Sequence, residues 1–83
     1  MSDDAVHHPA HYGGKDNPYE AIKVIEAWGL GFCLGNAVKY ISRAGRKDGE
    51  DPVECLMKAK WYLEHEIERL EAGQRLQFLQ AQI

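Results

Sequence analysis

The stretch that decides the fold is DPVECLMKAKWYLEHEIERLEAG, residues 51–73. Asp51 is a good helix N-cap, Pro52 suits the first helical position, and Glu54 follows the cap by three residues. Apolar residues then recur at helical spacing: Leu56, Ala59, Leu63, Ile67 and Leu70. The pattern predicts a helix of about 20 residues that ends at Gly73 and carries an apolar seam.

Two shorter helices are expected before this one. The first spans about residues 18–28, with Asn17 as its cap and Glu20 completing a capping box. The second spans about residues 32–44, where Gly45 provides a C-terminal stop. No segment has the alternating pattern of a strand. The fold class is therefore all-α, a small three-helix domain with a long third helix.

The two ends of the chain differ from the helical domain of residues 17–73. Residues 1–16 are rich in Asp, His and Gly, lack helical or strand periodicity, and are expected to form an extended arm. The C-terminal tail, residues 74–83, has three apolar residues that could continue it as a short helix: Leu76, Leu79 and Ile83. Exposed apolar residues usually need a partner surface, so this tail is a candidate for self-association. The alternative is a frayed end with no role.

Length and composition restrict the class of protein. The chain has 83 residues and two cysteines, too few for a disulfide framework, so Cys33 and Cys55 are expected to be buried and reduced. A chain of this length buries little surface alone, which favours a homo-oligomer. No run approaches the roughly 20 apolar residues that cross a bilayer. No signal-like segment opens the chain, so a cytosolic protein without membrane contact is expected.

Positive charge is concentrated in one segment of an acidic chain whose net charge is −3. Residues 35–47, the basic segment, hold four cations and no acid: Lys39, Arg43, Arg46 and Lys47. Asn36, Lys39 and Arg43 share one side of the predicted helix. So compact a positive segment favours a phosphate-bearing small molecule over a nucleic-acid duplex, which the acidic third helix would repel. The alternative is a solvated basic helix end that stabilises the helix dipole.

Histidines near the N-terminus raise the question of a metal. His8 and His11 could share one with His65 from the third helix. The chain lacks the ligand number and spacing of a zinc site, however, so no metal is predicted. We expect Pro9 to fix a turn that lays His11 and Tyr12 against the helices, where they stack on a nucleotide base or simply pack.

Acids on the third helix are a second place where a metal could bind. Three glutamates recur at helical spacing and could gather Mg²⁺ if the protein were a kinase: Glu64, Glu68 and Glu71. The second acidic pair that all-α nucleotide pyrophosphatases need is missing. With Lys58, Lys60 and Arg69 nearby, a salt-bridged solvated face is the competing interpretation. There is no P-loop and no Gly-x-Gly-x-x-Gly motif, and catalytic residues cannot be assigned.

Three blocks of sequence together resemble a known family. They are His8-Pro9-Ala10-His11-Tyr12, the run from Trp28 through Gly35-Asn36-Ala37-Val38-Lys39-Tyr40-Ile41-Ser42-Arg43-Ala44-Gly45-Arg46-Lys47, and Lys58-Ala59-Lys60-Trp61-Tyr62-Leu63. Over residues 7–71 the chain resembles the SaV-like family of small bacteriophage proteins, a domain of unknown function. The nucleotide kinase of T7-like phages is similar in this region. It phosphorylates deoxynucleoside monophosphates without a recognisable phosphate loop and forms large oligomers.

The resemblance implies a phage protein in the host cytoplasm and makes a nucleotide the expected anion. The cations named above would hold the phosphates, Asn36 would hydrogen-bond the ligand or the arm, and His11, Tyr12 or Trp61 would hold the base or shape the pocket. The leading hypothesis is a nucleotide-binding protein that sequesters a host nucleotide or nucleotide signal and needs no cofactor. The alternatives are a nucleoside monophosphate kinase without a P-loop, and a module that docks on a host protein and has no small ligand.

Overall fold

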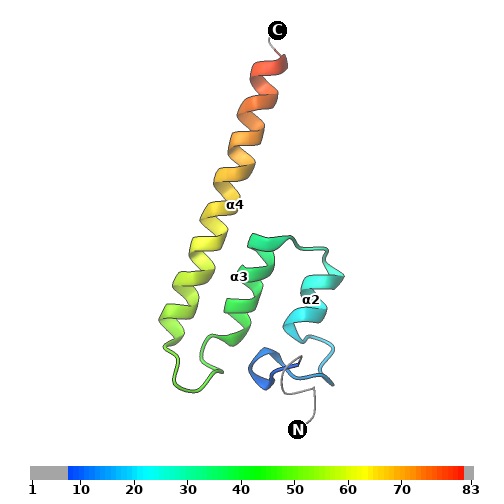
Figure 1. Ribbon diagram of the computed structural model, residues 1–83, viewed down its shortest axis with the longest axis vertical. Helices are drawn as coiled ribbons and strands as arrows, with labels where there is room; N and C mark the ends of the chain where they lie inside the picture. The colour runs from blue at the N-terminus through cyan, green and yellow to red at the C-terminus, as the bar shows by residue number, and fades with distance from the viewer. Residues whose placement is uncertain (1–7, 82–83) are drawn as a thin grey trace.

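The computed structural model describes residues 8–81 and confirms the all-α class. Its elements are a short 3-10 helix, η1 (Ala10–Tyr12), and three α-helices, α2 (Ala21–Ala27), α3 (Phe32–Arg43) and α4 (Pro52–Ala81). In Figure 1, α3 lies antiparallel along the first part of α4, and α2 packs on the other side of α3. The second half of α4 projects beyond the other helices. The fold is thus a helical hairpin with a small helix and an arm on one side.

Two helix boundaries follow the local chemistry expected from the sequence. The backbone N–H of Val53 donates to the Asp51 side-chain oxygen at 3.0 Å, so Asp51 caps α4. The end of α3 is followed by Gly45 at φ 79°, a left-handed conformation that glycine adopts at little cost. These two residues set where the turn between α3 and α4 starts and stops.

The start of α2 differs from the prediction. Asn17 does not cap a helix at Pro18: its side-chain oxygen accepts from the Tyr19 N–H at 2.8 Å, and its carbonyl accepts from the Glu20 N–H at 3.1 Å. These bonds close a local turn, and the helix begins only at Ala21. An asparagine side chain can form such a turn or cap a helix with similar hydrogen bonds, so the sequence motif alone could not decide between them.

The predicted helix end at Gly73 is wrong. Helix α4 runs without a break from Pro52 to Ala81, a length of 30 residues. A glycine inside a helix costs only about 0.5–1 kcal/mol relative to alanine, and its neighbours Ala72 and Gln74 are good helix formers. The tail from residue 74 is therefore a continuation of α4 rather than a separate short helix. Ile83 lies outside the described residues.

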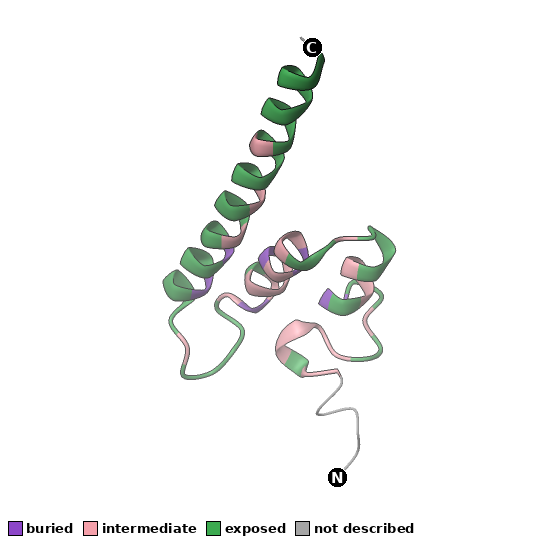
Figure 2. Ribbon diagram, turned by 45° about the horizontal axis from the view of Figure 1, so that its top comes forward, coloured by how far each residue is buried: buried purple, intermediate pink, exposed green. Residues whose placement is uncertain are grey.

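The core is narrow and made of small side chains. Its buried apolar residues are Ala21, Ala37, Cys55 and Ala59. Figure 2 shows buried positions of α3 and α4 on the sides where these helices meet. Gly35 is also buried, and a Cβ atom there would lie 3.3 Å from Cγ2 of Ile25, so α2 approaches α3 closely at this point. Small residues bring the helices together and leave the large apolar and aromatic side chains toward the outside.

The shape of the molecule reflects the projecting helix. Its extents are 60 × 26 × 18 Å. Its Cα radius of gyration is 16.5 Å, compared with about 12 Å for a compact domain of this length. Across residues 8–81, none of the helices combines the length and apolar character needed to cross a bilayer.

Candidate functional site

The basic segment ends in a buried ion pair. Arg43, the last residue of α3, is only 9% exposed. One guanidinium nitrogen, Nη2, donates to Oε2 of Glu50 in the loop before α4. The other, Nη1, donates to the Tyr12 hydroxyl at 2.9 Å. Arg43 therefore joins the arm, the end of α3 and the loop before α4, while its buried Nε has no hydrogen-bond partner among residues 8–81.

Glu50 is the centre of a wider charge cluster. Its carboxylate lies 3.5 Å from Nζ of Lys47 and 3.8 Å from Nζ of Lys58, and it accepts from the buried Cys55 thiol at 3.3 Å. The hydrogen bond from Arg43 lowers the Glu50 pKa from 4.5 to about 2. Burial and the neighbouring carboxylate raise the Cys55 pKa, which keeps that thiol protonated. One carboxylate thus faces three cations, so the cluster has a net positive charge.

The Tyr40 ring lies among cations from both long helices. Lys39 Nζ is 4.6 Å from the ring centroid, and Lys58 Nζ and the Arg43 guanidinium carbon are each 5.4 Å away. These distances are within the range of cation–π attraction. Tyr40 also stacks on Tyr62 of α4, with centroids 6.0 Å apart and planes 13° apart. The ring therefore brings the half-buried Lys39 and the exposed Lys58 close to one aromatic surface.

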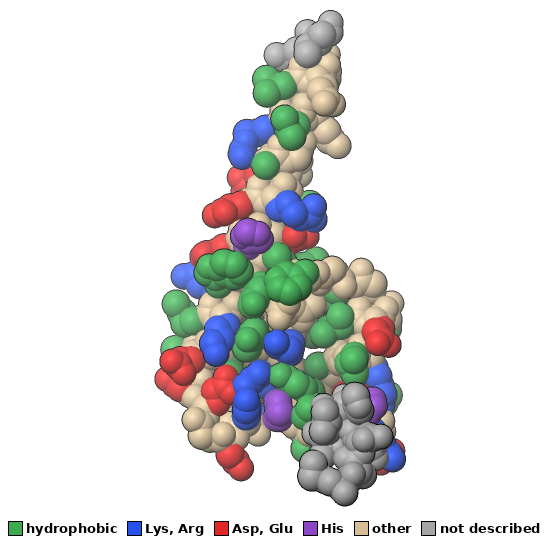
Figure 3. All heavy atoms as spheres, in the orientation of Figure 1, with side chains coloured by type: hydrophobic (Ala, Val, Ile, Leu, Met, Phe, Trp, Pro, Cys, Tyr) green, Lys and Arg blue, Asp and Glu red, His purple; other side chains and the backbone are tan. Residues whose placement is uncertain are grey.

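Beside Tyr40 is a surface hollow with aromatic walls. Its volume is about 330 Å³, and it is lined by Tyr40, Lys58, Trp61 and Tyr62. Trp61 is 57% exposed and stacks on His65 at 5.2 Å, with the two planes 10° apart. Figure 3 shows apolar side chains gathered over the α3–α4 hairpin, with basic side chains directly beside them. We call this surface, Lys39, Tyr40, Lys58, Trp61 and Tyr62, the aromatic-basic face.

His11 and Tyr12 lie on η1 at the edge of the charge cluster. Their rings are 4.1 Å apart, and the Arg43 guanidinium is 5.8 Å from the Tyr12 ring. Burial lowers the His11 pKa, and the positive charges of Arg43 and Lys47 lower it further. The structure therefore brings the two arm residues next to the basic segment, with His11 neutral at pH 7.

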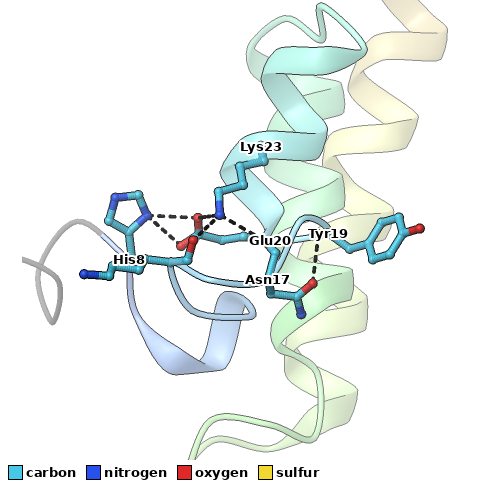
Figure 4. A network of polar contacts seen from close by, with 6 residues as sticks. His8, Asn17, Tyr19, Glu20 and Lys23 are labelled. Atoms are coloured by element: carbon cyan, nitrogen blue, oxygen red, sulfur yellow. Dashed lines mark hydrogen bonds and ion pairs between the residues drawn. The ribbon is translucent and has the colours of Figure 1, made fainter.

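A second polar cluster holds the arm in place (Figure 4). Glu20 is fully buried, and its carboxylate accepts from His8 Nδ1 at 2.8 and 2.9 Å. Lys23 Nζ lies 3.5 Å from the same carboxylate and donates to the Asn17 carbonyl at 3.0 Å. A buried carboxylate is costly unless it is paired in this way. Gly13 packs directly beneath, since a Cβ atom there would lie 3.0 Å from the Glu20 Cα.

The chain was compared with known proteins. A family model of proteins of unknown function, DUF3310, matches residues 6–64. This chain belongs to the DUF3310 family. No curated protein matches it, and no solved structure does. The DUF3310 region contains the arm, α2, α3, the Glu50 cluster and the aromatic-basic face, and it ends before the projecting half of α4.

Three residues proposed from the sequence are placed elsewhere on the DUF3310 domain or are only partly engaged. Asn36 donates to the Phe32 carbonyl of its own helix at 2.8 Å and lines a separate hollow of about 380 Å³ that also includes Lys39. Arg46 is exposed and makes no side-chain hydrogen bond to the described residues. Lys47 is exposed but lies against Glu50. Lys39 therefore lines the hollow beside Asn36 and reaches the aromatic one only through its contact with the Tyr40 ring, whereas Arg46 has no ion-pair partner among residues 8–81.

The candidate metal ligands lie in three different places. His8 contacts Glu20, His11 contacts Tyr12, and His65 stacks on Trp61. Residues 8–81 contain no group of three His, Cys, Asp or Glu side chains arranged to hold a metal ion. On α4, Glu64 pairs with Lys60 at 3.8 Å and Glu71 with Arg75 at 4.0 Å, as expected for a salt-bridged solvated face.

The two cysteines differ in burial. Cys33 and Cys55 are both free thiols, but only Cys55 is buried as expected from the sequence.

Sequence reasoning missed the residues that organise the DUF3310 site. No motif marks Glu50, although it follows Arg43 by seven residues across a glycine-containing loop. No pattern singles out Tyr40, and Lys58 is expected on a solvated face. Their aromatic and basic character was visible in the sequence. Their proximity depends on how α3 packs against α4, which periodicity does not specify.

Proposed function

We propose that this DUF3310 protein is a bacteriophage nucleotide-binding protein that works in the host cytoplasm and holds its ligand on the aromatic-basic face. The single observation that carries the proposal is the hollow between Tyr40 and Trp61, which is lined by aromatic rings and Lys58, with Lys39 against the Tyr40 ring beside it. The resemblance to SaV-like phage proteins, and through them to the phage nucleotide kinase, supports a nucleotide as the ligand.

The aromatic rings suit a nucleobase. Trp61 and Tyr62 meet edge to face, with centroids 5.0 Å apart, and Trp61 leaves more than half of its surface exposed. Stacking of a nucleobase on an exposed aromatic side chain contributes about 1–3 kcal/mol to binding, whichever base it is. The hollow's volume of about 330 Å³ is at the small end of the range for ligand sites, which suits one nucleotide better than two.

The cations suit the phosphates of the same ligand. Lys39 and Lys58 flank the Tyr40 ring, and Lys47 and Arg46 extend the positive charge along the loop. Lysine binds phosphate as a mobile point charge, so exposed lysines can move a few ångströms to meet it. In this proposal Arg43 acts on the ligand indirectly. It is largely buried, so it would supply positive field and position the lysines through Glu50 and Tyr40.

Thermal shift of the purified chain with mono-, di-, tri- and cyclic nucleotides tests the proposal, because a ligand that binds only the folded state raises Tm. The nucleotide giving the largest shift is then titrated by calorimetry against two variants. Trp61→Ala removes the stacking surface and Lys58→Gln removes one cation. Each is expected to raise Kd by about tenfold.

Two matched controls separate the site from nonspecific effects. Trp28→Ala removes the other exposed tryptophan, which directly follows α2, and Lys60→Gln removes a neighbouring lysine that pairs with Glu64 instead. Both are expected to leave Kd unchanged. If every nucleotide leaves Tm unchanged, the proposal is wrong and a host-protein docking role takes its place. If the bound nucleotide is converted to diphosphate in the presence of ATP, the protein is a kinase rather than a binder.

A further inference from the structure

Among residues 8–81, no other helix packs on the distal half of α4. The hollow at the start of α3, lined by residues of the Gly31–Cys33 segment, reaches along α4 as far as Arg69. Beyond it, α4 continues alone to Ala81. An isolated helix shorter than about 12–15 residues is marginal in water. The distal segment therefore depends for its helical structure on continuity with the packed half of α4 or on contact with another surface.

One side of α4 carries a stripe of exposed apolar residues, with Lys60 and Gln74 lying among them on the same side. Its members are Leu56 (50% exposed), Leu63 (40%), Ile67 (52%), Leu70 (49%) and Phe78 (63%). At these spacings, all five side chains lie within about a quarter of the helix circumference. This stripe is distinct from the side of α4 that packs on α3, which carries Cys55 and Ala59. A large apolar stripe that runs the length of a helix indicates a protein contact.

The stripe is nearly symmetric about its centre. Leu56 precedes Ile67 by eleven residues and Phe78 follows it by eleven. Leu63 precedes it by four residues and Leu70 follows by three. If a second copy of α4 lies antiparallel across the first, Ile67 meets Ile67, Leu56 meets Phe78, and Leu63 lies beside Leu70. Self-complementarity of this kind is the requirement for a two-fold symmetric interface.

We propose that two copies of this chain pair antiparallel through these stripes, with the two-fold axis beside Ile67. The cations on and beside the stripe are compatible with this pairing, because Lys60 and Arg75 each neutralise a glutamate of their own helix. Residues 53–81 of the two copies overlap over about 43 Å of helix. The projecting half of each α4 lies along the proximal half of the other, so the segment that is bare in the monomer is covered in the pair.

This interface leaves the aromatic-basic face accessible. Trp61 is six residues from Ile67, which places it on a different side of α4 from the stripe. Dimerisation and nucleotide binding are therefore separate properties, and failure of one does not imply failure of the other.

Disulfide trapping tests both the partner and the direction of pairing. In a Cys33→Ser background, Ile67→Cys is expected to cross-link to itself under mild oxidation, because the two positions face each other at the axis. Leu56→Cys and Phe78→Cys are each expected to remain monomeric on denaturing gels alone and to cross-link when mixed. Glu68→Cys, the next residue along but on another side of the helix, is the control and is expected not to cross-link. Self-linking of Leu56→Cys would overturn the antiparallel arrangement.

Sedimentation equilibrium of the full chain provides an independent measurement. The wild-type chain is expected to be a dimer, and Ile67→Glu, which places two carboxylates at the axis, is expected to raise the dimer Kd at least about tenfold. Circular dichroism checks that the variant keeps the helix content of the proximal hairpin. A wild-type chain that is monomeric throughout, or a variant that dimerises as well as wild type, would refute the proposal.

Discussion

The guanidinium of Arg43 and the carboxylate of Glu50 form the contact that closes the α3–α4 hairpin. Arg43 is the last residue of α3, and Glu50 is in the loop just before the Asp51 cap of α4. Both are largely shielded from solvent, and Tyr12 of the arm joins them through its hydroxyl. A residue expected to bind ligand from its charge is thus first a structural residue.

Replacing Arg43 should destabilise the protein more than replacing any other cation of the basic segment. Arg43→Ala leaves the shielded Glu50 carboxylate and the Tyr12 hydroxyl without their main partner, so Tm is expected to fall by roughly 5–10 °C. Arg46→Ala is the matched control: its side chain is exposed, and Tm should change little. Thermal unfolding followed by circular dichroism makes the comparison. Equal, small shifts for both variants would show that the ion pair does not support the fold.

Stability should depend on acid in a way that Glu50 controls. Its pKa is lowered from 4.5 to about 2 in the folded state, so the stabilisation is fully present above pH 4.5. It is lost as the pH falls from there through about 2. Tm of wild type and of Glu50→Gln, measured from pH 7 to pH 2, should therefore differ by a constant amount down to about pH 5 and then converge. A difference that is as large at pH 3 as at pH 7 would contradict the assignment.

Gly73 offers a simple test of the long continuous helix. A Cβ atom at this position meets nothing within 4 Å, so Gly73→Ala is expected to stabilise the chain by about 0.5–1 kcal/mol. The contrasting variant is Gly49→Ala, at φ 78°, which should destabilise the loop between α3 and α4. Urea unfolding of both gives the sign of each change. If Gly73→Ala had no effect or lowered stability, the helix would not continue through this residue.

The ionisation of His11 reports where the phosphates lie. Burial is the main cause of its lowered pKa, and the positive charges of Arg43 and Lys47 lower the pKa further. An anion bound near these cations should therefore raise the His11 pKa again. An NMR pH titration of the imidazole with and without the best-binding nucleotide measures the change. The matching nucleoside, which has no phosphate, should leave the His11 pKa unaltered. A nucleotide that binds without moving this pKa would place its phosphates elsewhere.

Features determined by neighbouring residues in the chain could be predicted, and features determined by packing could not. The Asp51 cap and the stop after α3 depend on a few consecutive residues, and both are as expected. Asn17 and Gly73 are ambiguous locally, because an asparagine can close a turn as well as cap a helix and a glycine can lie inside a long helix. Their surroundings decide between these states.

The same distinction applies to the candidate site. The cations of the basic segment were evident from sequence, but the partner of Arg43 depends on a loop whose course no periodicity describes. Tyr40 becomes a contact point for Lys39 and Lys58 only because α4 runs antiparallel beside α3. A charge pattern therefore located the region, and the packed structure was needed to distinguish the structural cation from the accessible ones.

The small-residue contact between α3 and α4 has a consequence for how the family can diversify. Ala37, Cys55 and Ala59 set the distance between the helices, and little larger would fit there. Tyr40 and Tyr62 stack on each other across this contact, whereas Trp61 is more than half exposed. Trp61 can therefore be exchanged for another group with little effect on the packing of α3 on α4, whereas a change at Tyr40 or Tyr62 alters the hairpin itself.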